Sequence, residues 1–291
     1  MYIFINLFIL LTVLFLYIHI NHNIKTSNYL EIYEIDEPSK DYLEDICNKK
    51  QPTMIKNLNI HDISTYNLSY LENNYSSFEL NICNNMNNHN IKLILSDSIK
   101  LFDNDISSTY ISCNNMYFIK DTTLEKTLSN IDMFYRPINT VYKEYDILLG
   151  SKNAYTKMKS ELYSRNYLIV VQGSVELILT PPRYSSYLHS DINYENLEYV
   201  SKLNVHDESS TDNNIKKVKM LNTILKPGEM IFIPSYWFYS IKILEDDTLI
   251  YNFKYRTLMY NMSIMPKLIG SILQKNNTHH IFTKILDAKI K

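Results

Sequence analysis

The sequence has 291 residues, 45% of them hydrophobic, which is enough for one large domain with short appendages. Its 29 Lys and Arg residues are balanced by 31 Asp and Glu residues, so the net charge is −2. That balance argues against a general nucleic-acid binder, whose affinity depends on a concentrated positive surface. No nucleic-acid partner is therefore predicted.

Residues 2–20 form a nearly continuous apolar stretch without Lys, Arg, Asp or Glu. A helix of this length spans about 28 Å, close to the thickness of the bilayer core. A cleaved signal peptide is the alternative, but no Lys or Arg precedes the stretch and no small-x-small cleavage site follows it. We predict an uncleaved, single-pass transmembrane anchor over residues 1–22, whose orientation is weakly specified because Lys25 is the nearest cation.

The N-terminal half of the remaining chain predicts short strands and helices in alternation. Strands are expected at Leu30–Ile35, Pro52–Leu58, Phe78–Ile82 and Ile91–Leu95, and helices at Ser39–Cys47, Ile60–Leu71 and Thr122–Ile131. Ser39 and Thr122 are the expected N-caps, and Glu125 stands at capping-box spacing from Thr122.

The three cysteines, Cys47, Cys83 and Cys113, are widely spaced and form no Cys-x-x-Cys pair. This spacing indicates neither a zinc site nor a disulfide framework. We expect free, buried thiols, with a Cys83–Cys113 bridge as the alternative if the domain lies in an oxidising compartment.

The second half predicts antiparallel strands joined by tight turns, the wall of a barrel or sandwich. The expected strands are Tyr155–Tyr163, Tyr167–Val171, Val175–Leu179, Met230–Ile233, Ser240–Leu244 and Thr248–Tyr255. Apolar residues at helical spacing then predict two helices in a C-terminal segment over residues 257–291, at Met262–Gln274 and His279–Ile290.

The segment Pro227-Gly228-Glu229, the apolar run after it, Trp237 and Asn252-Phe253 together resemble the C-terminal strand pair of the cupin-like (JmjC-type) 2-oxoglutarate oxygenases. Gly173 and Pro181-Pro182 match the same family upstream, and the asparaginyl hydroxylase branch is the most similar. The resemblance implies a cupin-like domain over residues 28–256. Its fold would be mainly β with α decoration, around a double-stranded β-helix (cupin or jelly-roll) core in which Tyr155–Tyr163 lies near Trp237–Leu244.

The resemblance also implies an Fe(II) site made of a His-x-Asp pair and a distal His, with room for 2-oxoglutarate. The distal His position holds Tyr239. Two registers are open for the His-x-Asp pair: alignment on Thr156 gives Lys159 and Glu161, whereas alignment on Asn166 and Gly173 gives Ser160 and Leu162. Neither register offers a His, so we predict no metal and assign no catalytic residue.

The co-substrate side of this family pocket is altered as well. The family Lys that pairs with the 2-oxoglutarate carboxylate is replaced by Val175, which cannot form that ion pair. No cofactor is therefore predicted. The residues expected to line the pocket by this resemblance are Thr156, Asn166, Val175, Trp237 and Asn252.

Two other groups of histidines in the sequence are candidate metal ligands. His189-Ser190-Asp191 is a literal His-x-Asp, with His206 downstream, but it lies where the family has a polar surface loop, so we interpret it as a chance match. His279-His280 is interpreted as a solvated helix start.

Three functions remain open. The prediction is a membrane-anchored, non-catalytic cupin-like protein with a binding or scaffold role. The alternatives are an active 2-oxoglutarate- and Fe(II)-dependent protein hydroxylase or demethylase with substitute ligands, and a structural membrane protein of a virion or organelle. The C-terminal helices either pair two copies into a homodimer, as the similar asparaginyl hydroxylases do, or pack against the barrel.

Overall fold

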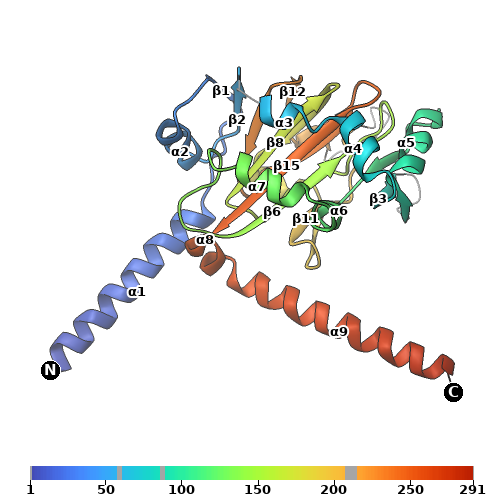
Figure 1. The fold of residues 1–291 in the computed structure, drawn as a ribbon. Coiled ribbons are helices and arrows are strands. Elements are labelled where there is room, and N and C mark those ends of the chain that lie inside the picture. The colour runs from blue at the N-terminus through green and yellow to red at the C-terminus, as the bar shows by residue number, and fades with distance from the viewer. Residues whose placement is uncertain (1, 58–60, 86–88, 207–214, 291) are drawn as a thin grey trace.

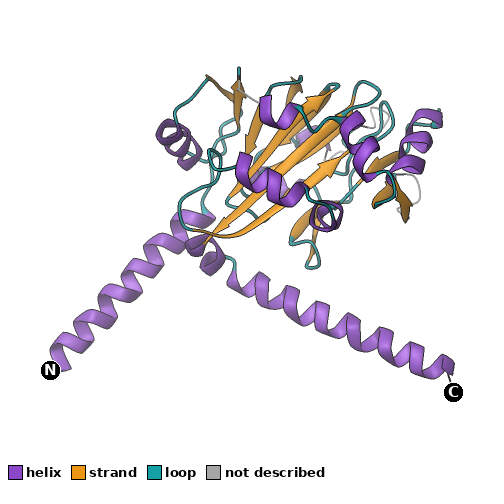
Figure 2. Cartoon of the chain, viewed as in Figure 1, coloured by secondary structure: helices purple, strands orange, loops and turns teal. Residues whose placement is uncertain are grey.

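The computed structural model describes residues 2–57, 61–85, 89–206 and 215–290. The part of the chain between two long helices, α1 (Tyr2–Ile24) and α9 (Met265–Ile290), forms a β-rich body. Both helices leave the same side of that body (Figure 1). Strands dominate the body, and short helices lie over one face of it (Figure 2).

Two six-stranded sheets face each other in the body. The first has the order β1 (Tyr33–Asp36), β2 (Thr53–Lys56), β13 (Met230–Ile233), β8 (Arg165–Gln172), β15 (Leu249–Thr257), β6 (Thr140–Leu148). The second has the order β10 (Ser190–Asn193), β11 (Glu198–Ser201), β7 (Lys159–Glu161), β14 (Phe238–Ile243), β9 (Val175–Thr180), β12 (Leu221–Leu225). The predicted double-stranded β-helix is therefore confirmed.

The two faces of the first sheet follow from the alternation of side chains along its strands. In β15, Tyr251 and Phe253 point away from the second sheet, whereas Ile250 belongs to the apolar cluster between the sheets. That inner cluster fills one part of the barrel with side chains from both sheets, such as Leu168 and Leu177. The barrel is thus a packed core there and not an open channel.

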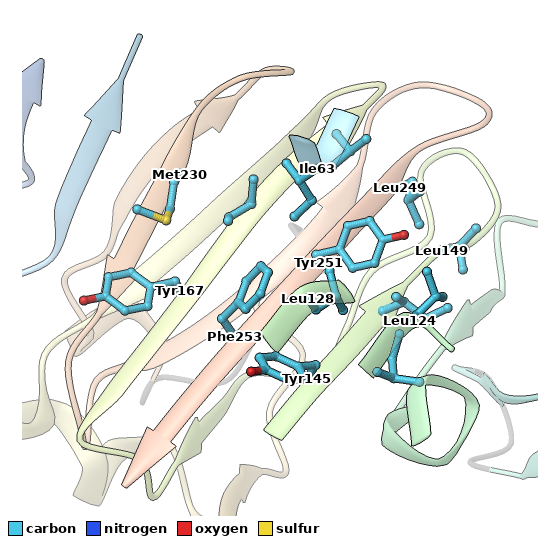
Figure 3. Close-up of a cluster of buried hydrophobic side chains, with 14 of the residues drawn as sticks. Ile63, Leu124, Leu128, Tyr145, Leu149, Tyr167, Met230, Leu249, Tyr251 and Phe253 are labelled. Atoms are coloured by element: carbon cyan, nitrogen blue, oxygen red, sulfur yellow. The ribbon is translucent and has the colours of Figure 1, made fainter. Parts of the chain in front are cut away.

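Helices cover the outer face of the first sheet. They are α2 (Lys40–Asn48), α3 (His61–Ser64), α4 (Leu68–Tyr75), α5 (Leu95–Asn104), α6 (Met116–Asp121) and α7 (Leu124–Ile131). Figure 3 shows Leu124 and Leu128 of α7 against Tyr145 and Phe253 of the sheet. Burial of such side chains is worth about 1.5–3 kcal/mol each, so this layer is a main source of stability.

A small sheet of order β4 (Asn90–Ile94), β3 (Glu79–Asn84), β5 (Tyr110–Ser112) lies at one end of the body. A disulfide joins Cys83 in β3 to Cys113, just after β5. The expectation of free thiols is wrong for this pair, because β3 and β5 pair and bring the two residues within 6.1 Å between Cα atoms. Cys47 is free and buried, as predicted.

The predicted helix caps have different outcomes. Ser39 caps α2, since its hydroxyl accepts from the Tyr42 N–H at 3.3 Å. Thr122 does not cap α7: its hydroxyl donates to the Ile119 carbonyl at the end of α6 (3.1 Å), and α7 begins later, at Leu124. The helix expected over Thr122–Ile131 is thus confirmed as α7, and α6 precedes it where no helix was expected.

Two other segments differ from the prediction. The helix expected over Ile60–Leu71 is split into α3 and α4, because the Asn67 side chain accepts from the Tyr70 N–H and starts a new helix; Ile60 itself lies outside the described residues. Of Tyr155–Tyr163, only β7 is regular strand, although it lies beside β14 as predicted.

The C-terminal segment forms α8 (Leu258–Ser263) and α9 (Met265–Ile290). The break expected between Gln274 and His279 is wrong, since no Gly or Pro interrupts the helix there. His279-His280 therefore does not start a helix; its side chains lie outside the described ones.

The N-terminal helix α1 is exposed along its apolar length, with mean hydropathy 2.5 over its most apolar window. Among the described residues, it alone is long and apolar enough to cross a membrane, as a membrane anchor or a signal sequence is. Its C-terminal end is held to the body, because Lys50 Nζ donates to the carbonyls of His22 and Lys25.

Candidate binding site inside the barrel

Strand β7 places its residues on opposite sides of the second sheet, because successive side chains of a strand alternate. Lys159 and Glu161 point into the barrel, where both form ion pairs. Ser160 points to the outer surface. Leu162, beyond the strand, packs against Tyr260 and Ile264 near the C-terminal helices. Of the two registers, only the one aligned on Thr156 therefore brings both of its residues to the inside of the barrel.

Glu161 is the centre of a buried network. Its Oε1 lies 2.8 Å from Lys254 Nζ and 3.2 Å from Lys159 Nζ. Its Oε2 accepts hydrogen bonds from the Tyr239 hydroxyl and, at 3.0 Å, from the Asn166 amide. Both oxygens of the carboxylate are thus engaged by groups of the protein.

Further carboxylates complete the pairing of the two lysines. Lys159 Nζ lies 3.3 Å from Glu198 Oε2. Lys254 Nζ lies 3.5 Å from both Glu144 Oε1 and Asp146 Oδ2. The network therefore joins β6, β7 and β15 with β11 across the inside of the barrel.

The network controls the protonation of its members. Burial alone would raise the pKa of Glu161, but the ammonium groups of Lys159 and Lys254 outweigh it and lower that pKa well below its usual range. Burial likewise opposes the charge of Lys159, yet Glu161 and its neighbours raise the pKa of this lysine. Burial and the Glu161 charge both raise the pKa of Tyr239. At neutral pH the centre of the network is the Glu161 carboxylate, held by two ammonium ions and a phenol.

A cavity of about 430 Å³, the inner pocket, adjoins this network. It is lined by Lys159 and Tyr239, by Thr156 and Asn252, and by the Cys83–Cys113 disulfide. Asn252 Oδ1 is buried and has no hydrogen-bond partner in the part of the chain that the structure describes. The pocket thus offers a ligand an unused acceptor, close to Lys159 and to the lining carboxylates of Asp146 and Glu198.

The structure places the other sequence-derived pocket candidates elsewhere. Asn166 belongs to the Glu161 network. Val175 is buried among the apolar side chains of the barrel interior, in one cluster with Leu177 and Ile243. Trp237 is also buried, and its indole N–H donates to the Ser27 carbonyl at 2.9 Å. None of the three lines the inner pocket as described.

Comparison with known proteins bears on the whole body of the molecule. Residues 38–261 match the family described as "Cupin-like domain". The chain belongs to this family. The match runs from the residue before the Ser39 cap to α8, so it includes both large sheets apart from β1, and the network inside them.

Similar curated proteins are HSPB1-associated protein 1 of Rattus norvegicus, 28% identical over 112 residues, and of Homo sapiens, 27% identical over 112 residues. The aligned region is 38% of this chain and spans 23% of the length of these relatives. The similarity therefore concerns part of the cupin-like domain and not the whole of either protein.

The His-x-Asp motif outside the network does not assemble a site with His206. Asp191 pairs with Lys202 at 2.7 Å on the surface. His206 Nε2 is hydrogen-bonded to Ser240 Oγ at 2.7 Å. Within the described ranges, no group of three or more His, Cys, Asp and Glu side chains is arranged to hold a metal ion.

Several members of the Glu161 network were not predicted from the sequence: Glu144, Asp146, Glu198 and Lys254. A signal was available for Lys254, because it shares the face of Asn252 in a strand that is otherwise apolar and aromatic. A charge at such a position is seldom buried unless it is paired. The identity of its partners could not be read from the strand alone.

Proposed function

We propose that this cupin-like protein is a membrane-anchored binding protein that does not perform iron-dependent oxygenation. The observation that carries the proposal is the buried Glu161 network, which engages Lys159, Glu161 and Tyr239, the residues that the resemblance puts at the family's metal-binding positions. The inner pocket beside it is then available for a ligand that is bound and not transformed.

The donor set does not fit Fe(II). Imidazole nitrogens and a free carboxylate are the ligands of such facial sites, whereas the two Glu161 oxygens already accept from Lys254, Tyr239 and Asn166. A divalent cation here would also face two ammonium groups. Each ammonium about 4 Å from such an ion costs on the order of 8 kcal/mol at an effective dielectric of 20, twice the value for two unit charges.

Two features support a membrane-tethered domain on the non-cytosolic side. Helix α1 has the length and hydropathy of a membrane span. The Cys83–Cys113 disulfide is typical of secreted, lumenal or periplasmic environments, since cytosolic thiols are kept reduced. Together they favour an anchor at residues 2–20 with the cupin-like domain in an oxidising compartment.

A binding role for the inner pocket accords with the name of the relatives, which describes association of those proteins with HSPB1. A second copy of this chain is a further proposed partner, through α9. The first turns of α9 leave Met265, Ile269 and Ile272 exposed. Measuring the molar mass of the full chain in detergent by light scattering, with and without Ile269→Glu/Ile272→Glu, tests this pairing.

Metal analysis of the purified full chain, with a 2-oxoglutarate decarboxylation assay, tests the loss of oxygenase chemistry. We expect no stoichiometric iron and no turnover. The matched gain-of-site variant is Lys159→His/Glu161→Asp/Tyr239→His, which supplies the family ligand set. Retention of one iron per chain by the unmodified protein, together with 2-oxoglutarate turnover, would support the active hydroxylase instead. A purely structural role predicts that no small ligand bound in the inner pocket stabilises the chain against unfolding.

A further inference from the structure

A second cavity, the outer pocket, lies on the opposite face of the same sheet and measures about 810 Å³. Its floor takes one side chain from each of four neighbouring strands: Ser190, Tyr199, Ser160 and Phe238 of β10, β11, β7 and β14. Its walls are the end of α1 with the following linker, the 3₁₀ helix η1 (Pro182–Tyr187), and the start of α9. Three distant parts of the chain therefore build it.

The outer pocket is positively charged. Lys25, Arg183 and Lys267 line it, one from each wall, and its lining includes no Asp or Glu within the described residues. Lys267 lies against the rings of Tyr199 and Tyr236, at 5.1 and 5.0 Å from their centroids. Burial would lower the pKa of Lys267, but hydrogen bonds with the two tyrosines outweigh it and raise that pKa.

Among the described residues, these three cations have no counter-ion. In the part of the chain that is described, no carboxylate lies within 4.0 Å of Lys25, Arg183 or Lys267. Three like charges around one cavity repel one another, and a bound anion would relieve that repulsion.

A hydroxyl on the pocket floor is also unpartnered. Ser160 is fully buried, and its Oγ has no hydrogen-bond partner among the described residues. An unsatisfied buried hydroxyl is costly, so such groups are usually explained by an absent ligand or water. The first turn of α9 adds a partial positive charge at the wall. The negative partial charge at the C-terminal end of α1 is offset, because Lys50 Nζ donates to the carbonyls of His22 and Lys25 there.

The outer pocket lies at the depth of lipid headgroups. If residues 2–20 fill the bilayer core, Ile24 lies about 6 Å beyond it along the helix. Each headgroup layer is about 5–7 Å thick. Ile24, Lys25 and Thr26 line the outer pocket directly. A lipid phosphate at the membrane surface and the cationic pocket are therefore at the same level.

We propose that the outer pocket binds the phosphate group of an anionic phospholipid in the leaflet from which α1 emerges. The three cations surround the phosphate, and Ser160 Oγ donates to one of its oxygens. This inference rests on the membrane anchoring proposed above, and it is independent of whether the inner pocket binds iron. It gives the outer pocket a ligand of defined chemistry and fixes the body of the domain against the membrane.

The full chain in a neutral maltoside detergent is titrated with short-chain phosphatidic acid, and bound lipid is counted by native mass spectrometry. Trp237, the only Trp of the chain, gives a local signal, because its indole binds Ser27 between the pocket residues Thr26 and Asn28. Phosphatidylcholine of the same chain length is the zwitterionic control. Glycerol 3-phosphate is the soluble source of the same phosphate chemistry.

We expect phosphatidic acid to bind at least tenfold more tightly than phosphatidylcholine or glycerol 3-phosphate. Lys25→Gln/Arg183→Gln/Lys267→Gln should weaken it at least tenfold, because hydrogen bonds to charged groups are among the strongest. Ser160→Ala should weaken it several-fold while the fold is kept. The charge-matched control, three Lys→Gln changes on surfaces that line neither pocket, should stay within twofold; its positions are Lys92, Lys120 and Lys126.

Equal binding of the two lipids, or unchanged binding by the triple pocket variant, would overturn the assignment. Equally tight binding of glycerol 3-phosphate, with the same dependence on the variants, would assign the pocket to a soluble phosphate ester instead. Flotation of the unmodified chain with phosphatidylcholine vesicles reports on α1 alone. Failure of flotation therefore contradicts the anchor, whereas flotation without phosphatidic acid selectivity contradicts only the pocket assignment.

Discussion

The inner and outer pockets lie on the two faces of one sheet, and strand β7 contributes to both. On the inner face, Glu161 is buried and Lys159 is half-buried, and the two satisfy each other together with Lys254 and Tyr239. On the outer face, Ser160 has no hydrogen-bond partner among the described residues, and the cations around it have no carboxylate within reach. Inside a barrel, a charge must be paired by the protein itself. At the surface, solvent lets a set of like charges remain open for a ligand.

The largest effect should come from breaking the inner network. Glu161→Gln removes the anion between Lys159 and Lys254 and should lower the free energy of unfolding by about 3–5 kcal/mol, as for other broken buried pairs. Thermal and denaturant unfolding of the full chain in detergent measures this change. Ser160→Ala, one residue away on the outer face, is the control and should cost less than about 1 kcal/mol. Equal effects of the two changes would contradict the contrast.

Removing the disulfide at the rim of the inner pocket should have the next largest effect. Cys83→Ser/Cys113→Ser opens a loop with a sequence separation of 30 residues, which costs about 3–4 kcal/mol in the chain-entropy account. Unfolding in the presence and absence of reductant, with mass-spectrometric mapping of the bridge, measures this. Phosphatidic acid binding to the outer pocket should be unchanged, since the bridge lines only the inner pocket. A reductant-insensitive transition would show that the bridge does not stabilise the fold.

Acid should weaken the fold in two steps. Burial and the charge of Lys242 lower the pKa of His206 to about 4, below its ordinary value of 6.5. The unfolded chain therefore binds this proton first, and stability falls as the pH drops from about 6.5 to about 4, by about 1 kcal/mol after allowance for solvent screening. The lowered pKa of Glu161 also makes the fold less stable in acid. Its contribution to the free energy of unfolding is lost as the pH falls below about 4.5.

His206→Asn separates the two steps. Unfolding curves at a series of pH values should lose the slope between pH 6.5 and 4 in this variant, while the steeper loss at lower pH remains. A wild-type stability that is constant from pH 7 to 4 would contradict the role of His206.

The smallest effect on stability is expected from the outer pocket. Lys25→Gln/Arg183→Gln/Lys267→Gln should change the free energy of unfolding by less than about 1 kcal/mol without lipid, because partly exposed charges contribute little. Because the variant removes the repulsion among the three cations, this small change should be stabilising. Phosphatidic acid should raise the melting temperature of the unmodified chain and not that of the variant. A large loss of stability without lipid would indicate a structural role for these cations.

The sequence by itself determined the family, most strands and the apolar helix α1. Turn residues such as Pro227-Gly228 and the period of apolar side chains act over a few residues, so they can be read locally. The same local signals placed β13, β14 and β15, whereas the prediction that Tyr155–Tyr163 lies near Trp237–Leu244 came from the family resemblance. Where local signals compete, as at Thr122, the prediction failed by a residue or two.

Only the tertiary structure decided what the two faces of β7 contain. Sequence left both registers open, and it could not show that Lys254 would meet Glu161 from 93 residues away. The outer pocket and the Cys83–Cys113 bridge likewise join segments that are distant in the chain. The physical reason is that a charge or thiol interacts with whatever the fold brings within a few ångströms. Periodicity reports which face a side chain occupies, and the packing of the sheets alone selects its partner.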